Sequence, residues 1–406
     1  MATIASDFIR AIPKTDLHVH LDGSLRVATL IELAREGNVK LPSLTEDGLR
    51  ALVFKDTYAN LAEYLHGFAY TCRVLQGREA LERAAYELAA DSFEEGVRYI
   101  EPRLAPQLHA SDAMGMPDVV AAVEKGLQRA TSEFNARPEV RQGAEPPYAF
   151  GIIVCAMRMF TPSFSAYFRR LLEAHAYSPE RVVFGMASEE LARAALQMRD
   201  ELGLAVVGFD LAGQENGYPA HDHVEAYRAA HRNFFNKTVH AGEAYGAESI
   251  FEAITHLHTD RIGHGYYLFD TAKIDNPSIK ERDRYVRSIA EYIADRRITI
   301  EICLTSNLQT NPSLRSLSDH PLRKMLDAKI STAFCTDNRL VSQTSVSREI
   351  GLAVSELGLT PKQLKECVIH GFKRSFMPST YLEKRDYVRR VIDYYETLEK
   401  RWGIAG

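Results

Sequence analysis

Two histidines and an aspartate occupy alternate positions near the beginning of the chain. Residues 14–23 read KTDLHVHLDG, in which single apolar residues separate His18, His20 and Asp22. Side chains two apart in a β-strand share one face, so these three would point the same way. Two imidazoles on one rigid strand could form half of a metal site, because neutral imidazole is a good ligand for zinc and similar ions. A pair of hydrogen-bonded core histidines is the competing interpretation.

Polar residues also stand at the ends of four later strand-like runs. In chain order they are His240 with Glu243, His264, the segment 301–307, and Asp337 with Asn338. In an α/β barrel the carboxyl ends of all strands meet at one mouth, whatever their separation in the sequence. Histidines from two further strand ends and the Asp337 carboxylate, beside the first strand, would complete a metal site with three nitrogens and one oxygen.

The elements that must position these residues alternate between strand-like and helix-like segments. The eight candidate strands are residues 14–21, 97–104, 149–158, 205–211, 237–241, 260–264, 298–305 and 330–336. Eight strands that alternate with helices are typical of a (β/α)8 TIM barrel. A doubly wound open sheet is the competing architecture, but no Gly-x-Gly-x-x-Gly motif follows the first strand.

Extra helices are expected after the first strand and at the C-terminus. Residues 24–96 are too many for one barrel helix and contain several helical patterns, whereas residues 379–402 form one long amphipathic pattern. A further pattern over 188–203 predicts a helix that is capped by Ser188 and ends at Gly203. We expect one domain over residues 1–406, with 24–96 inserted in it.

Part of that insertion has a distinct apolar stripe. Leu61, Tyr64, Leu65 and Phe68 fall on one face of a predicted helix. One interpretation is an apolar lid over the barrel mouth, where loops and insertions build active sites. The other is ordinary packing against the core.

Composition is typical of a soluble globular protein. The 406 residues carry a formal net charge of -5 and are 46% hydrophobic, which gives no reason to expect nucleic acid as a partner. No apolar run approaches the ~20 residues that cross a bilayer, and the N-terminus does not resemble a secretory signal. The five widely spaced cysteines do not form a disulfide framework. We therefore expect a cytoplasmic protein without a membrane partner; the sequence does not indicate an oligomeric state.

The motifs together resemble those of the adenosine deaminase family, within the metal-dependent amidohydrolase superfamily. The resemblance covers nearly the whole chain, and its motifs are residues 13–23, 101–106, 210–215, 240–243, 261–265, 303–307 and 336–337. It implies a small-molecule purine nucleoside as substrate, deaminated by hydrolysis to inosine or a 6-oxo analogue and ammonia. It also implies that the apolar stripe over 61–68 is the family's lid, which contacts the substrate.

Roles for individual residues follow from the same resemblance. One zinc ion would be bound by His18, His20, His240 and Asp337. Glu243 would protonate N1 of the purine, and His264, with Asp337, would orient or deprotonate the attacking water. On the substrate, the Gly213 backbone would meet N3 and Asp22 would hold a ribose hydroxyl, next to His20.

Physical reasoning supports this division of labour. Displacing an amine from an aromatic ring needs a strong nucleophile, and zinc lowers the pKa of bound water from 15.7 to ~7. Attack at C6 places negative charge on N1 unless an acid supplies a proton. A glutamate three residues after a ligand, as Glu243 follows His240, can reach the substrate without binding the metal.

Other classes of protein fit less well. Cytidine-type zinc deaminases use His-x-Glu with Pro-Cys-x-x-Cys, and neither spacing occurs here. Binuclear amidohydrolases commonly need a bridging lysine on the fourth strand, but residues 205–215 contain none, which favours a single metal. A catalytically silent purine-binding protein is the alternative from another class. Intact ligands, acid and water-orienting histidine argue against it.

One position departs from the family pattern. The family usually has Thr-Asp-Asp-Pro near the eighth strand, whereas this chain has Thr336, Asp337, Asn338 and Arg339. The second aspartate of that motif contacts N7 of the purine, and N7 is a hydrogen-bond acceptor. The Asn338 amide could donate to N7 without first taking up a proton. Adenosine, a modified adenosine and adenine therefore all stay open as substrates.

Overall fold

Parallel strands lie side by side around a barrel in the computed structural model, which describes residues 4–404. The strands are β1 Lys14–His20, β2 Val97–Leu104, β3 Ala149–Phe150, β4 Ile152–Met157, β5 Val206–Ala212, β6 Asn236–Ala241, β7 Arg261–His264, β8 Thr299–Ile302 and β9 Ser331–Phe334. Their spatial order is β1-β2-β4-β5-β6-β7-β8-β9, and the short β3 pairs with β2. Every ladder is parallel, so the TIM barrel prediction is confirmed.

The barrel is closed next to the predicted metal ligands. Asp337, just beyond β9, forms a parallel bridge with Val19 of β1. The His20 N–H donates to the Asp337 carbonyl at 2.7 Å, and the Asp337 N–H donates to the His18 carbonyl at 2.8 Å. The first and last strands are therefore joined at the end that carries chemistry.

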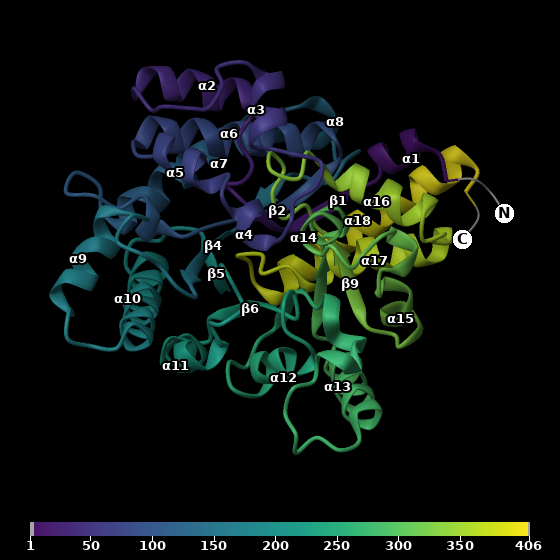
Figure 1. Cartoon of the computed structure of the whole chain (residues 1–406). Coiled ribbons are helices and arrows are strands. Elements are labelled where there is room, and N and C mark those ends of the chain that lie inside the picture. The colour runs from purple at the N-terminus through teal and green to yellow at the C-terminus, as the bar shows by residue number, and fades with distance from the viewer. Residues whose placement is uncertain (1–3, 405–406) are drawn as a thin grey trace.

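Helices surround the strands on the outside (Figure 1). The α-helices are α1 Ser6–Ala11, α2 Val27–Glu36, α3 Glu46–Leu52, α4 Leu61–Leu65, α5 Phe68–Val74, α6 Arg78–Glu94, α7 Met116–Asn135, α8 Pro138–Arg141, α9 Ala166–Ala174, α10 Glu180–Asp200, α11 Val224–Arg232, α12 Ala247–Thr255, α13 Arg282–Arg296, α14 Leu304–Thr310, α15 Leu322–Asp327, α16 Val346–Ser355, α17 Pro361–Arg374 and α18 Tyr381–Trp402. Short 3-10 helices are η1 Pro106–Leu108, η2 Ala220–His223, η3 Tyr266–Phe269, η4 Thr271–Lys273 and η5 Leu317–Asp319. No helix within residues 4–404 combines the length and apolar character needed to span a bilayer.

Two predicted strands differ from the observed ones. The candidate over 149–158 is interrupted at Gly151, where a Cβ atom would lie 2.5 Å from a methyl carbon of Val207. A glycine permits that approach, and the strand gains a second partner there: β3 pairs with β2, and β4 pairs with both β2 and β5. The candidate over 298–305 ends at Ile302, because Leu304 already begins α14.

The predicted start of the helix over 188–203 is wrong. Helix α10 begins at Glu180, and Ser188 is a buried residue inside it rather than its N-cap. The Ser188 hydroxyl donates to the Phe184 carbonyl, one turn back, at 3.2 Å and is 2.8 Å from Nδ1 of His223. A serine that bonds to the preceding turn can sit within a helix, so its type alone does not mark a boundary.

The C-terminal helices follow the sequence prediction more closely. Helix α18 packs on α17 and on α1 (Figure 1). At the contact with α1, the rings of Phe8 and Tyr395 meet edge to face with their centroids 5.9 Å apart. Trp402, at the last turn of α18, is 40% exposed.

The 24–96 segment contains five helices, α2 to α6. Helix α6 packs on β2 and α7 and takes the place of the ordinary barrel helix. The predicted single helix over 61–68 is divided, because α4 ends at Leu65 and α5 begins at Phe68, after His66 and Gly67. The apolar stripe is nevertheless continuous in space, since both helices face the same pocket.

Candidate active site

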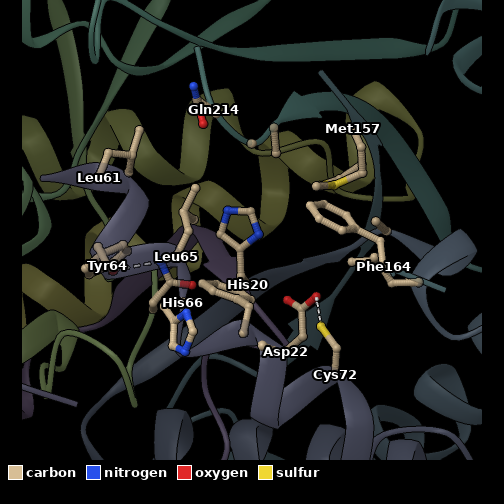
Figure 2. Close-up of a pocket in the computed structure, with 18 of the residues that line it drawn as sticks. His20, Asp22, Leu61, Tyr64, Leu65, His66, Cys72, Met157, Phe164 and Gln214 are labelled. Carbon is tan, nitrogen blue, oxygen red and sulfur yellow. Dashed lines mark hydrogen bonds between the residues drawn. The ribbon is translucent and has the colours of Figure 1, made fainter. Parts of the chain in front are cut away.

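One deep pocket of about 630 Å³ opens at the carboxyl ends of the strands. Its walls include the residues singled out in the sequence, namely His20, Asp22, Leu61, Tyr64, Leu65, Phe68, Gly213, His240, Glu243, His264, Asp337 and Asn338. Figure 2 shows Leu61, Tyr64 and Leu65 on one side of His20, with Met157 and Phe164 opposite. His18 is fully buried, in contact with the other histidine rings. The loops that follow the strands thus bring the predicted residues together.

Donor atoms at the base of the pocket converge as a metal ion would require. Nε2 of His20 lies 3.2 Å from Nε2 of His240 and 3.5 Å from Oδ1 of Asp337. Nε2 of His18 lies 3.4 Å from the same carboxylate oxygen and has no hydrogen-bond partner among the described residues. A buried imidazole nitrogen left without a partner is costly, and a shared divalent ion would satisfy it together with its neighbours. The residues present therefore fit a metal.

Carboxylates behind two of these histidines fix their tautomers. His18 Nδ1 lies 2.8 Å from Glu301, and His240 Nδ1 lies 3.1 Å from Asp210. Each carboxylate accepts the Nδ1 proton and leaves the Nε2 lone pair directed at the cluster. Metal-binding histidines are commonly held in this way by an outer carboxylate.

A buried ion-pair network holds those carboxylates. Arg103 donates to Asp210 at 2.8 Å and to Glu301 at 3.0 Å, and Arg261 donates to Glu301 at 2.7 Å. Burial alone would raise the pKa of Glu301, but the two guanidinium groups hold it well below its usual range. Both carboxylates stay ionised, as their role behind the imidazoles requires.

A chain of hydrogen bonds sets the tautomer of His264, starting from a backbone N–H that can only donate. The Leu322 N–H donates to Nδ1 of His320 at 3.1 Å, so neutral His320 carries its proton on Nε2. That proton points to Oδ1 of Asn307 at 3.2 Å, and the Asn307 amide nitrogen therefore donates to Nδ1 of His264 at 3.1 Å. We refer to Leu322, His320 and Asn307 as the relay. It leaves the His264 proton on Nε2.

This tautomer decides what His264 can do. Burial lowers the pKa of His264 to about 3, so the ring is neutral and its Nε2–H is a donor. A ring nitrogen of His264 lies within 4.8 Å of ligand atoms of His18, His240 and Asp337. The Nε2 atom carries the proton, however, so it has no free lone pair with which to bind an ion. Its backbone also has φ of 66°, a left-handed conformation rare for histidine, which aims the ring at the mouth of the barrel.

The Glu243 carboxyl faces this donor, and its loop is tightly held. Oε1 of Glu243 lies 3.8 Å from Nε2 of His264. The Glu215 carboxylate accepts the backbone N–H groups of residues 242–245, at 2.6 to 3.0 Å, and the Ser249 hydroxyl. Burial raises the pKa of Glu243 to about 8, so it holds its proton at neutral pH. No role for Glu215 followed from the sequence, although it ends the 210–215 motif.

Asn338 contacts α4 from the loop that follows β9. Its amide nitrogen donates to the Tyr64 hydroxyl at 2.8 Å, and that hydroxyl lies 2.7 Å from Oγ of Ser342. An amide nitrogen has two protons, so one stays available to a ligand in the pocket. Arg339 points away from the pocket and forms ion pairs with Glu95 at 2.6 Å and Asp16 at 3.2 Å.

Chemistry at one mouth of a parallel barrel, with a protonated carboxyl opposite a cluster of imidazoles, defines an aminohydrolase of the (β/α)8 class. The model of the adenosine deaminase family matches residues 13–202 and 185–394. The chain belongs to the adenosine deaminase family.

Similar proteins agree with this assignment. Adenosine deaminase 1 of Streptomyces coelicolor is 35% identical over 405 residues, which cover 98% of this chain and 91% of the relative. A probable adenosine deaminase of Dictyostelium discoideum is 31% identical over 397 residues; these are 97% of this chain but 44% of that relative. Among solved structures, the N6-methyl-AMP deaminase of Arabidopsis thaliana superposes with a TM-score of 0.70 at 26% identity, covering 96% of this chain and 98% of its own.

Proposed function

We propose that the protein removes the 6-amino group of adenosine, or of a closely related 6-aminopurine nucleoside, by hydrolysis with one bound zinc ion. The observation that carries this proposal is the position of the Glu243 carboxyl, whose Oε1 atom lies 3.8 Å from Nε2 of His264 across the pocket. Burial raises the pKa of this carboxyl to about 8, which suits a proton donor. His18, His20, His240 and Asp337 would hold the ion, because His264 has its lone pair engaged by the relay. A bound zinc ion would lower the pKa of water enough to supply hydroxide at neutral pH.

The residues of the chain then divide the proton transfers. The His264 Nε2–H donates a hydrogen bond to the attacking oxygen and directs it towards C6. Glu243 gives its proton to N1 as the ring accepts charge, which prevents a negative charge on N1. The C–N bond breaks as the amino group takes up the proton of the new C6 hydroxyl, and ammonia and the 6-oxo purine are released. The proton that the attacking water gave up returns to Glu243, which restores the acid.

The substrate's sugar would lie at the Asp22 end of the pocket. Oδ1 of Asp22 is buried without a hydrogen-bond partner among residues 4–404, so a ribose hydroxyl could donate to it. A carboxyl group in this position suits a hydroxyl better than a phosphate, whose charge it would oppose when ionised. Gly213, with φ of 96°, would present its backbone to N3 of the base.

A panel of purines tests the proposal. Adenosine, N6-methyladenosine, adenine and the corresponding 5′-phosphates would be compared by release of ammonia or methylamine. We expect the nucleosides to react and adenine to react poorly, since the base alone leaves Asp22 without a partner. A preference for 5′-phosphates would indicate a substrate like that of the N6-methyl-AMP deaminases instead of a nucleoside. Binding of a nucleoside without turnover, in zinc-loaded protein, would instead support a silent binding protein.

The relay predicts an effect of a residue beyond the pocket wall. Asn307→Asp should shift the His264 proton from Nε2 to Nδ1, because a carboxylate accepts from both of its imidazole neighbours. The His264 donor towards the attacking oxygen would be lost, and kcat should fall ~10²-fold or more with zinc still bound. Gln309→Glu, the same amide-to-acid change on α14 outside the relay, is the matched control and should retain far more activity. Equal rates in the two variants would show that the tautomer of His264 does not matter.

The second amide hydrogen of Asn338, which is not donated to Tyr64, predicts a hydrogen bond to N7 of the purine. A substrate analogue with carbon at position 7 would leave that buried donor unpaired, which costs ~1–3 kcal/mol, a factor of about 5–150 in kcat/KM. In Asn338→Ala the natural substrate should lose this advantage over the analogue, so the ratio of the two kcat/KM values approaches one. If the substitution leaves this ratio unchanged, the Asn338 amide donates to Tyr64 only and does not contact N7.

A further inference from the structure

A second group of metal-binding side chains lies at the sugar end of the pocket. Asp22 follows β1, Cys72 lies on α5, and His109 follows η1; all three are buried. One ligand atom from each lies within 4.8 Å of the other two. Figure 2 shows the Asp22 carboxylate directed at the Cys72 thiol, beside His20. Neither the family resemblance nor the proposed reaction gives a role to Cys72 or His109.

The distances from Asp22 to the other two donors are close to those between ligands of a tetrahedral zinc ion. Sγ of Cys72 lies 3.7 Å from Oδ2 of Asp22, and Nε2 of His109 lies 3.9 Å from the same oxygen. Zinc bonds to sulfur, nitrogen and oxygen place neighbouring ligand atoms ~3.3–3.6 Å apart. Side-chain shifts of a few tenths of an ångström would bring both donors to that distance from Asp22.

His109 already has the tautomer of a metal ligand. Its Nδ1 donates to the Leu75 carbonyl at 3.0 Å, so the lone pair is on Nε2 and points at the cluster. This Nε2 atom is buried and has no hydrogen-bond partner in the described part of the chain, as is the case for Nε2 of His18 in the first site. An outer carbonyl on one ring nitrogen and a free, buried lone pair on the other is the usual setting of a histidine ligand.

We propose that Asp22, Cys72 and His109 form a second, inhibitory site for a thiophilic divalent cation such as Zn²⁺ or Cd²⁺. Asp22 and Cys72 line the pocket, so the fourth coordination position faces the space that the sugar would fill. An ion at this site removes the Asp22 acceptor and blocks the sugar. This inhibition rests on the proposed function, whereas binding of the ion does not.

The second ion binds more weakly than the catalytic one. The Cys72 thiol releases its proton to solvent as its sulfur bonds to the metal. Burial and the nearby Asp22 raise the pKa of that thiol well above its usual range, so removing the proton costs affinity. The first site offers four donors and the second three, so dialysed enzyme holds one ion and the second enters only at excess metal.

Cobalt(II) tests binding separately from activity. Enzyme holding one equivalent of metal is titrated with Co²⁺, and a near-ultraviolet thiolate-to-cobalt charge-transfer band is recorded. The proposed ligands of the first site contain no sulfur, so this band reports a cysteine ligand outside that site. Cys72→Ser should lose the band and His109→Gln should weaken it, whereas Cys155→Ser, another buried pocket cysteine, should keep it. Absence of the band in the unmodified enzyme, or its presence in Cys72→Ser, overturns the second site.

Kinetics with excess Zn²⁺ test the consequence. Zinc should raise the apparent KM for the nucleoside without lowering kcat, and Cys72→Ser should lose this inhibition relative to its own zinc-free rate. Inhibition that persists in Cys72→Ser places the inhibitory ion elsewhere and overturns the proposal. If the protein turns over no purine, the proposed function fails, and the cobalt band still decides whether the second site exists.

Discussion

Replacing Glu243 by glutamine should lower kcat ~10²–10⁴-fold while the fold and the bound metal are retained. The amide has the same shape as the carboxyl. It cannot transfer a proton to N1 of the purine. The loop keeps its position because Glu215, not Glu243, holds the N–H groups of residues 242–245.

The measurements are single-turnover rate, metal content and thermal stability. Glu252→Gln on α12, outside the pocket, is the matched control and should behave as the unmodified enzyme. Loss of metal from Glu243→Gln would show that Glu243 is a ligand, contrary to the proposed set.

The pH profile gives a second test of the same group. Burial raises the pKa of Glu243 to about 8. The protonated form is the one that donates to N1, so kcat/KM should fall as the pH rises through that value. The profile of kcat/KM reports groups of the free enzyme. Glutamine does not titrate, so the variant should lack this falling limb at its much lower rate.

The sequence predicted the strand ends well because the signal there is local. Alternation of polar and apolar residues over 14–23 places His18 and His20 on one face, and the barrel brings the later ends to the same mouth. Asp337 could be placed next to β1 because a closed barrel must join its first and last strands, as the bridge to Val19 confirms.

The supporting contacts could not be predicted in this way. Glu215 acts on the Glu243 loop, 27 to 30 residues further along the chain, through backbone N–H groups that no sequence pattern marks. His320 reaches His264 only through Asn307, and its donor is a backbone amide. Ser188 failed as a helix cap because its hydroxyl bonds to the Phe184 carbonyl, one turn back inside α10, and contacts His223 from a distant segment. Such contacts depend on the packing of segments far apart in the chain.

Removing the metal should abolish turnover, and one equivalent of Zn²⁺ should restore it. The enzyme would be stripped with a chelator and titrated with zinc, with ammonia release and melting temperature as the two readouts. An ion that binds only the folded chain stabilises it by about 4 kcal/mol at 1,000 times its Kd, so Tm should rise together with activity. Full activity after exhaustive chelation would contradict the proposal.

The Glu301 carboxylate, which holds Nδ1 of His18, allows a test of whether the metal binds to the proposed ligands. Glu301→Gln keeps the size of the side chain but weakens its hold on the Nδ1 proton of His18, and it leaves Arg103 and Arg261 short of a buried partner. Changes in such outer partners typically cost ~10–100-fold in metal affinity or activity. Zinc affinity should therefore fall by that factor, while excess zinc restores occupancy of the first site.

Glu349→Gln is the matched control. Glu349 is also buried, but it bonds to Thr305 and Thr344 rather than to a histidine of the cluster. Zinc affinity should be unchanged in this variant even if its stability falls. Burial raises the pKa of Glu349 to about 7, so the two substitutions match in burial and in the change from carboxyl to amide rather than in charge. A difference in zinc affinity between them ties the loss to the position of Glu301 behind His18. Equal affinities would mean that the metal is held without His18, and the ligand set would have to be redrawn around His20, His240 and Asp337.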